Sequence, residues 1–138
     1  MKMKIKLDPG AKMPTRAHKT DAGLDLYSPV SLILYHEDSI CIDTGVHVAI
    51  PEGYVGMVKS KSGLNVRYGI TSEGVIDSGY TGSIVVKLYN HGHASVPIEK
   101  GQKISQLVLL PIITPELELV AELEETERGN GGFGSTGR

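Results

Sequence analysis

The sequence has few cysteines and no long apolar stretch, and each of these absences excludes a class of protein. It contains a single cysteine, Cys41, among 138 residues, which excludes an internal disulfide and fits a reducing compartment. Its longest apolar stretch, Leu107 to Ile113, is interrupted by Pro111 and is too short to span a bilayer. The N-terminal MKMKIKLDPG has no apolar stretch behind it and is not a signal peptide. We therefore expect a cytoplasmic protein that does not engage a membrane.

An excess of positive charge is also missing. The formal net charge is −2, whereas a surface that binds nucleic acid is usually strongly basic. Nucleic acid is therefore not expected as a partner. The chain shows no internal repeat at solenoid spacing, and its 138 residues are most simply one domain with a sizeable core.

Short runs of strand-forming residues recur along the chain. Its seventeen glycines and seven prolines supply many turns, and β-branched runs at this spacing are typical of an all-β sandwich or barrel. The one helical candidate is Ser62 to Tyr68, a single short turn at most. The expected strands are Lys4 to Leu7, Leu24 to Tyr27, Val30 to Leu34, Ile40 to Ile50 with a break near Thr44-Gly45, Tyr54 to Val58, Ile84 to Tyr89 and Ile104 to Leu110.

The segment from Glu116 to Glu127 follows no single period. Alternate apolar residues from Leu117 to Leu123 indicate a strand, although Leu119, Val120 and Leu123 also fit a helix. We expect a strand followed by a linker. The six glutamates of this segment are expected to form a solvated face.

The last eleven residues, Arg128 to Arg138, read RGNGGFGSTGR and hold five glycines and the only phenylalanine, Phe133. Ordering eleven residues costs on the order of 10–20 kcal/mol at about 1–2 kcal/mol each. The tail is therefore expected to be loose unless a ligand supplies ordering energy. Its arginines, glycine amides and hydroxyls suit a polyanion, and its lone ring suits a flat face to stack on, which together indicate a nucleotide.

The tail has two other interpretations. The spacing from Gly129 to Thr136 superficially fits a phosphate loop, but serine occupies the position of the required lysine. A phosphate loop must also open a helix, and only two residues follow Thr136. The phosphate-loop interpretation therefore fails, and the simpler alternative is a disordered terminus.

Four internal segments share this chemistry. Asp21 and Asp25 surround a glycine, and Lys61-Ser62-Gly63 places a cation and a hydroxyl beside a small residue that a phosphate can approach. Asp77 follows two β-branched residues at the mouth of an expected hairpin. Gln106 lies among apolar neighbours and needs hydrogen-bond partners from core or ligand. Each segment alone could instead be an ordinary turn or strand.

In order and wording, these five segments closely resemble the trimeric dUTP pyrophosphatase (dUTPase) family. The family's motifs read approximately AGxDL, RSGL, GVIDxxY, GxRIAQ and RGxGGFGSTG. Any one match is weak, but five in series are specific. Here they stand as Ala22 to Leu26, Lys61 to Leu64, Gly74 to Tyr80, Gly101 to Gln106 and Arg128 to Gly137.

The resemblance implies a fold and an activity. The fold is an all-β, β-clip or jelly-roll-like barrel over residues 1–127, with a flexible C-terminal lid over residues 128–138 that is part of the active site. The activity is Mg²⁺-dependent hydrolysis of dUTP to dUMP and pyrophosphate, which limits uracil in DNA and supplies dUMP for thymidylate synthesis. The family also implies a homotrimer in which three subunits build each site.

The resemblance further assigns roles to residues. Asp77 would orient and deprotonate the water that attacks the α-phosphorus, and Tyr80 would lie against the deoxyribose and exclude a 2′-hydroxyl. Asp25 would reach Mg²⁺ through a coordinated water. Uracil would pair with the hairpin backbone, including Gly74, Val75 and Ile76, and would be covered by Phe133. The triphosphate would meet Lys61, Ser62, Gly63, Gln106, Arg128, Gly134, Ser135 and Thr136.

Two departures and two rival functions accompany this resemblance. Lys61 stands where the family usually has arginine, which turns a bidentate contact into a point charge. Ser60 stands where proline is common, and we expect a less rigid loop there. The rivals are a dCTP deaminase on the same fold and a nucleotide-binding regulatory protein. The intact Asp77 segment and the complete tail motif argue against the deaminase.

Overall fold

The computed structural model describes residues 1–137, and Arg138, the last residue of the expected lid, lies outside the described residues. The chain up to Pro111 forms short strands and one helix. No helix within residues 1–137 is long and apolar enough to cross a membrane. The elements are β1 (Lys4–Leu7), β2 (Gly23–Tyr27), β3 (Leu32–Leu34), β4 (Ser39–Ala49), β5 (Tyr54–Ser60), α1 (Ser62–Tyr68), β6 (Ile70–Ile76), β7 (Ser83–Asn90), β8 (Val96–Ile98) and β9 (Lys103–Pro111).

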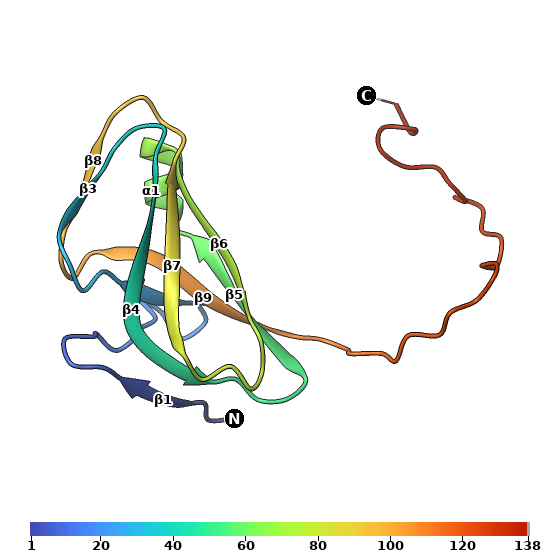
Figure 1. Cartoon of the computed structure of the whole chain (residues 1–138), viewed down its shortest axis with the longest axis horizontal. Coiled ribbons are helices and arrows are strands. Elements are labelled where there is room, and N and C mark those ends of the chain that lie inside the picture. Colours follow the sequence, from blue (N-terminus) through green and yellow to red (C-terminus); the bar gives the residue numbers. More distant parts are fainter. Residues whose placement is uncertain (138) are drawn as a thin grey trace.

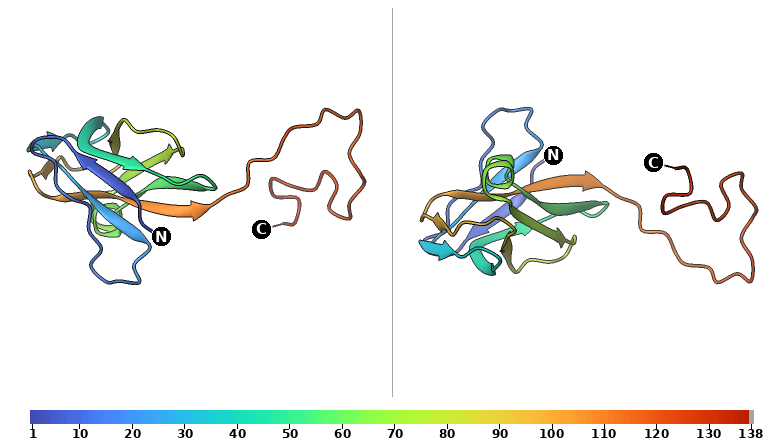
Figure 2. Two further views of the ribbon diagram at one scale, coloured as in Figure 1. Left: turned by 90° about the horizontal axis from the view of Figure 1, so that it is seen from below. Right: turned by 90° about the horizontal axis from the view of Figure 1, so that it is seen from above.

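The strands form a curled sheet. Seven of them follow the order β1-β4-β7-β6-β5-β9-β2, while β3 and β8 make a separate pair. Every pairing is antiparallel. The sheet wraps around a common interior, as Figures 1 and 2 show from three directions. The all-β, barrel-like fold expected from the sequence is confirmed.

The core is aliphatic because the strands alternate. In β7 every second residue is buried, namely Ile84, Val86 and Leu88, as a period of two requires for a half-buried strand. The buried Asn90 at its end donates to the carbonyls of Leu34 and Ala94. The other fully buried apolar side chains are Leu26, Leu34, Val46, Val58, Ile70, Ile98, Ile104 and Leu107.

Strand β6 changes partner along its length. Its first residues, Ile70 to Ser72, pair with β7, whereas Glu73 to Ile76 pair with β5. The ladder between β6 and β7 ends at the Ser72–Leu88 pair. The two arms of this hairpin therefore diverge toward the loop of residues 77–82.

The chain after β9 leaves the barrel. Residues 112–137 contain no helix or strand, and Figure 1 shows them running away from the sheet. The strand expected within Glu116 to Glu127 is therefore wrong for this chain. Its alternate apolar residues, including Leu117 and Leu119 at 95% and 100% exposure, find no surface on their own chain to bury against.

Candidate functional site

Asp25 is the centre of a buried ionic cluster. It lies in the middle of β2, is 5% exposed, and binds Lys61 Nζ through Oδ1 at 2.6 Å and Lys103 Nζ through Oδ2 at 2.7 Å. Burial acts to raise the pKa of Asp25, but the hydrogen bonds from Lys103 and Lys61 outweigh it and lower that pKa. Two ammonium groups and one carboxylate leave this cluster with a net charge of about +1.

Gln106 lies beside this cluster because Gly23 makes room for it. Gln106 pairs with Asp25 across β2 and β9, and its amide donates to the Ser60 carbonyl at 3.0 Å. A Cβ on Gly23 would lie 2.0 Å from the Gln106 side-chain oxygen, so a larger residue there would displace the glutamine. The first, second and fourth of the five segments are thus brought together.

The second segment opens helix α1. Lys61 is the extended N-cap residue, and Ser62 and Gly63 are exposed. A Cβ on Gly63 would meet nothing within 4 Å. The packing of this chain therefore does not require glycine at 63, and the backbone there is open to approach by a ligand or a second chain.

Ser60 holds the start of this segment. Its hydroxyl donates to the Ser72 carbonyl at 3.2 Å and accepts from the Ser72 amide at 2.9 Å. Beneath it, the Ser72 and Ser105 hydroxyls are hydrogen-bonded at 2.7 Å. Ser60 thus ties the end of β5 to β6 through two hydrogen bonds. The lower rigidity expected of serine in place of the family's proline stays a prediction.

Asp77 and Tyr80 share one turn between β6 and β7. The Tyr80 amide donates to the Asp77 carbonyl at 3.2 Å, and Gly79 supplies the left-handed φ of 88° that the turn needs. The Tyr80 hydroxyl donates to the Ser83 carbonyl at 2.9 Å. The ring lies over Gly82, where a Cβ would fall 2.4 Å from the tyrosine oxygen. Both side chains are exposed.

The Asp77 turn and the ionic cluster lie at opposite ends of β5. Ile76, just before Asp77, pairs with Gly56 near the start of β5, whereas Lys61 follows the last residue of that strand. Five residues at about 3.3 Å each separate Gly56 from Lys61 by roughly 16 Å. Within one chain, the Asp77 turn and the Lys61 segment are therefore separated by most of the length of β5.

The C-terminal segment contacts mainly itself. Arg128 Nε donates to the Gly131 carbonyl at 2.7 Å, and Phe133 is fully exposed with a left-handed φ of 49°. Figure 2 shows the segment apart from the barrel in both views. Arg128, Phe133, Gly134, Ser135 and Thr136 are thus not brought to the other expected site residues of this chain.

Lys103 is the residue that sequence reasoning did not single out. It belongs to the fourth segment, but its contact with Asp25 depends on the register of β2 and β9, in which Tyr27 pairs with Lys103 after an irregularity. The signals in the sequence were a cation three residues before Gln106 and the arginine that stands at this position in the family motif GxRIAQ. Those signals could not identify the carboxylate with which Lys103 pairs.

The side chains of this site suit a divalent metal ion only if water lies between the ion and the protein. Within residues 1–137 no group of three His, Cys, Asp or Glu side chains could hold one. Both Asp25 oxygens already accept from lysines, which disfavours direct coordination of a dication. The donor set is compatible with an ion that brings its own ligands and meets Asp25 through water.

The all-β barrel and the order of the five segments are those expected for the family that the sequence resembles. A sequence model described as dUTPase matches residues 10–137. The chain belongs to the dUTPase family, and the family resemblance predicted from the sequence is confirmed.

Individual relatives agree with this assignment. The chain is 42% identical to the deoxyuridine 5′-triphosphate nucleotidohydrolase of Clostridium tetani, over 99% of this chain and 97% of that protein. The dUTPase of Staphylococcus bacteriophage 80alpha, solved with dUPNHPP, superposes with a TM-score of 0.94 at 37% identity and 99% coverage of both chains. A mutant dUTPase of phage phi11 of S. aureus, described as coordinating a structural Mg(II) ion, matches with a TM-score of 0.84 at 33% identity, over 91% of this chain and all of that one.

Proposed function

We propose that this protein hydrolyses dUTP to dUMP and pyrophosphate, and so limits uracil in DNA while supplying dUMP for thymidylate synthesis in the cytoplasm. The observation that carries the proposal is the family match over residues 10–137. The relative that was solved with dUPNHPP, a nucleotide analogue, supports it further.

Asp77 is the proposed general base. Its carboxylate lies exposed in the turn after β6, where it can orient a water for attack on the α-phosphorus and accept its proton. Tyr80, held in the same turn by the hydrogen bond of its amide to Asp77, would cover the deoxyribose. A ring in that place rejects a ribonucleotide by steric exclusion of the 2′-hydroxyl.

The nucleoside and phosphate ends would be bound by different parts of the fold. The diverging edges at Gly74, Val75 and Ile76 offer backbone donors and acceptors that match uracil. The cationic cluster, with Lys61 beside the exposed Ser62 and Gly63 and with Gln106 adjacent, would take the phosphates. Its net positive charge favours a polyanion over any neutral ligand.

Magnesium would enter with the triphosphate. The ion would neutralise charge on the phosphate oxygens, which supply its inner ligands together with water. Asp25 would accept a hydrogen bond from one of those waters. Its two existing lysine contacts would keep it ionised and hold it in place.

We further propose that each site is shared between subunits of a homotrimer. The separation of roughly 16 Å along β5 supports a site in which the Asp77 turn of one chain meets the Lys61 segment of another. The C-terminal arm, which extends from its own barrel (Figure 1), would close over such a site. Arg128 would clamp the phosphates together with Gly134, Ser135 and Thr136, while Phe133 would stack on the uracil.

One assay tests the proposed function. The protein is incubated with Mg²⁺ and either dUTP or dCTP, and both pyrophosphate and ammonia are measured. We expect pyrophosphate from dUTP and no ammonia from dCTP. Ammonia from dCTP, or nucleotide binding without pyrophosphate release, would overturn the proposal in favour of a deaminase or a binding protein.

A further inference from the structure

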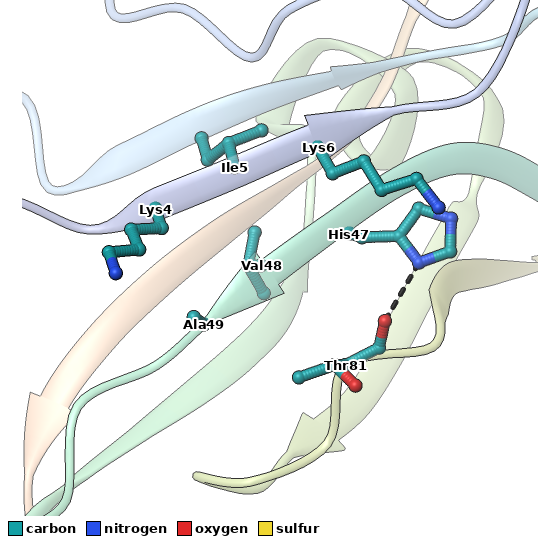
Figure 3. A pocket seen from close by; sticks show the side chains of 7 residues that line it. All are labelled: Lys4, Ile5, Lys6, His47, Val48, Ala49 and Thr81. Atoms are coloured by element: carbon teal, nitrogen blue, oxygen red, sulfur yellow. Dashed lines mark hydrogen bonds between the residues drawn. The ribbon is translucent and has the colours of Figure 1, made fainter.

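His47 connects the loop after Asp77 and Tyr80 to the barrel by hydrogen bonds. Its ring lies half-buried on β4, with Nδ1 at 2.8 Å from the Thr81 carbonyl and Nε2 at 3.0 Å from Asp8 Oδ2. Thr81 directly follows Tyr80, so this contact fixes the backbone next to the tyrosine. Figure 3 shows the ring between β1 and the loop, with its bond to Thr81.

Both partners of the ring are hydrogen-bond acceptors. A carbonyl oxygen and a carboxylate oxygen each require an N–H, and a neutral imidazole has only one. If only Nδ1 were protonated, the Nε2 lone pair would face the Asp8 carboxylate. If only Nε2 were protonated, a lone pair would face the Thr81 carbonyl. Only the imidazolium donates to both oxygens.

The charges around the ring favour that form. The hydrogen bonds to Asp8 and to the Thr81 carbonyl raise the pKa of His47, against the opposing charge of Lys6, whose side chain extends toward the ring (Figure 3). The part of the loop next to the ring, Thr81 to Ser83, carries no charged side chain. The charged groups around the ring are Lys4 and Lys6 of β1, Asp8 after β1, and Asp43 of β4.

The register of β4 creates this contact. The pairing of β4 with β7 is interrupted between Asp43 and His47, and resumes with His47 opposite Ser83. Gly45 supplies the positive φ of 66° at this irregularity, and the Thr44 hydroxyl donates to the Ile84 carbonyl. The bulge thus carries the imidazole to the mouth of the hairpin. There the ladder between β6 and β7 no longer holds the loop.

We propose that the imidazolium of His47 is a positioning residue that holds the Tyr80–Thr81 segment, so that nucleoside binding weakens when the ring loses its proton. This inference rests on the proposed function, because it assumes that Tyr80 contacts the substrate. His47 does not touch the reacting atoms. Its loss should therefore raise KM for dUTP while kcat changes little.

The direction of the pH effect follows from the raised pKa of His47. Both hydrogen bonds of the ring are present below the pKa of a free imidazole, about 6.5, and one of them is lost as the pH rises through the higher value in the folded protein. We expect KM to rise by about three- to tenfold across that interval, since one hydrogen bond is lost. His47→Gln has no group that titrates in this range, so this variant should show the higher KM at every pH.

The test combines two measurements on the full chain. NMR follows the His47 imidazole and the Tyr80 and Thr81 amides from pH 5.5 to 9, and kinetics follows KM and kcat for dUTP over the same range. We expect the amide shifts and KM to change with the midpoint of the imidazole. Asp8→Asn, which replaces the carboxylate with a neutral amide and so removes the negative charge that favours the imidazolium, should move that midpoint to lower pH. His93→Gln, at an exposed histidine before β8, is the matched control and should leave the wild-type profile.

Two outcomes would overturn the inference. One is that the chemical shifts of the Tyr80 and Thr81 amides do not change as His47 titrates. The other is that His47→Gln, shown to be folded by its amide spectrum, keeps the pH dependence of KM. The NMR titration needs no substrate, so it decides the structural link even if the protein does not hydrolyse dUTP. Failure to release pyrophosphate would instead contradict the proposed function.

Discussion

The Asp25 carboxylate accepts a hydrogen bond from Lys61 at 2.6 Å, which ties the centre of β2 to the N-cap of α1. A second lysine, Lys103, binds the other carboxylate oxygen at 2.7 Å. Because Asp25 is buried and the lysines are partly exposed, the buried carboxylate holds the two ammonium groups in place where they can face solvent. This arrangement suits a site that binds an anion at the start of the helix.

Replacing Asp25 should destabilise the fold as well as the site. Asp25→Asn leaves two lysines facing each other around a neutral amide. We expect the free energy of unfolding to fall by about 1–3 kcal/mol, reduced from the value for a fully buried pair because the lysines are partly in solvent. Urea denaturation at a fixed protein concentration measures it. Asp21→Asn, at a more exposed carboxylate that contacts the exposed His18, is the control and should unfold like the wild type.

The contribution of Asp25 to the free energy of unfolding should depend on pH. The pKa of Asp25 is lowered in the folded protein, so its stabilisation is complete above about pH 4 and is lost as the pH falls through the lower folded value. The difference in unfolding free energy between the wild type and Asp25→Asn should therefore shrink in acid. A difference that stays constant down to pH 2 would contradict the ion-pair assignment.

Asp77→Asn should separate catalysis from binding. Because Asp77 is exposed in a turn, the substitution should leave the fold intact. Turnover of dUTP should fall by about 10²–10⁴-fold, the usual contribution of a general base, while the dissociation constant for a non-hydrolysable analogue stays near the wild-type value. Glu73→Gln, at an exposed acid on β6, is the control. Wild-type turnover in Asp77→Asn would refute its role as the base.

Removal of residues 128–138 should leave a folded and feebly active protein. The arm extends away from the barrel (Figure 1), so the melting temperature should change little. Turnover should fall by roughly 10³-fold or more, by analogy with a late-arriving arginine finger. A truncated protein that unfolds would mean that the arm stabilises the barrel instead of completing the site.

Much of the fold could be predicted from local patterns. The helix Ser62–Tyr68 and strand β1 have the expected bounds, and the predicted break near Thr44-Gly45 is the irregularity within β4. The expectation of a single short helical turn at most is wrong, because the seven residues of α1 make about two turns. Strands β6 and β8 were not among those expected. Strand β8 has only three residues, and its central residue, Pro97, argues against a strand in the sequence. Strand β6 contains Ser72, Glu73 and Gly74, which lower strand propensity.

The site was less predictable, because it depends on strand order. Sequence motifs identified Asp25, Lys61 and Gln106, but only the register of β2 on β9 brings Asp25 to Lys103. Similarly, no local pattern indicates that Asp77 and Lys61 lie at opposite ends of β5. The bond from His47 to Thr81 spans thirty-four positions and depends on a bulge. Contacts of this kind are set by tertiary pairing and have no local signature.

The central claim is a site shared between subunits, and mixing of inactive chains tests it most directly. Asp77→Asn disables the turn, and Ser62→Asp places a repelling carboxylate at the phosphate end, where the first turn of a helix tolerates it. The two variants are co-expressed with different tags, and mixed trimers are purified through both tags. As a matched control, Asp77→Asn is co-expressed with Asp77→Ala, since both of these changes remove the same carboxylate.

If the turn of one chain meets the phosphate segment of another, each mixed trimer has both parts intact in one of its three sites, about one third of the sites. The account predicts that Asp77→Asn with Ser62→Asp regains activity of that order, while the control pair stays inactive. Mixed trimers of the first pair that are as inactive as either parent would contradict the shared site.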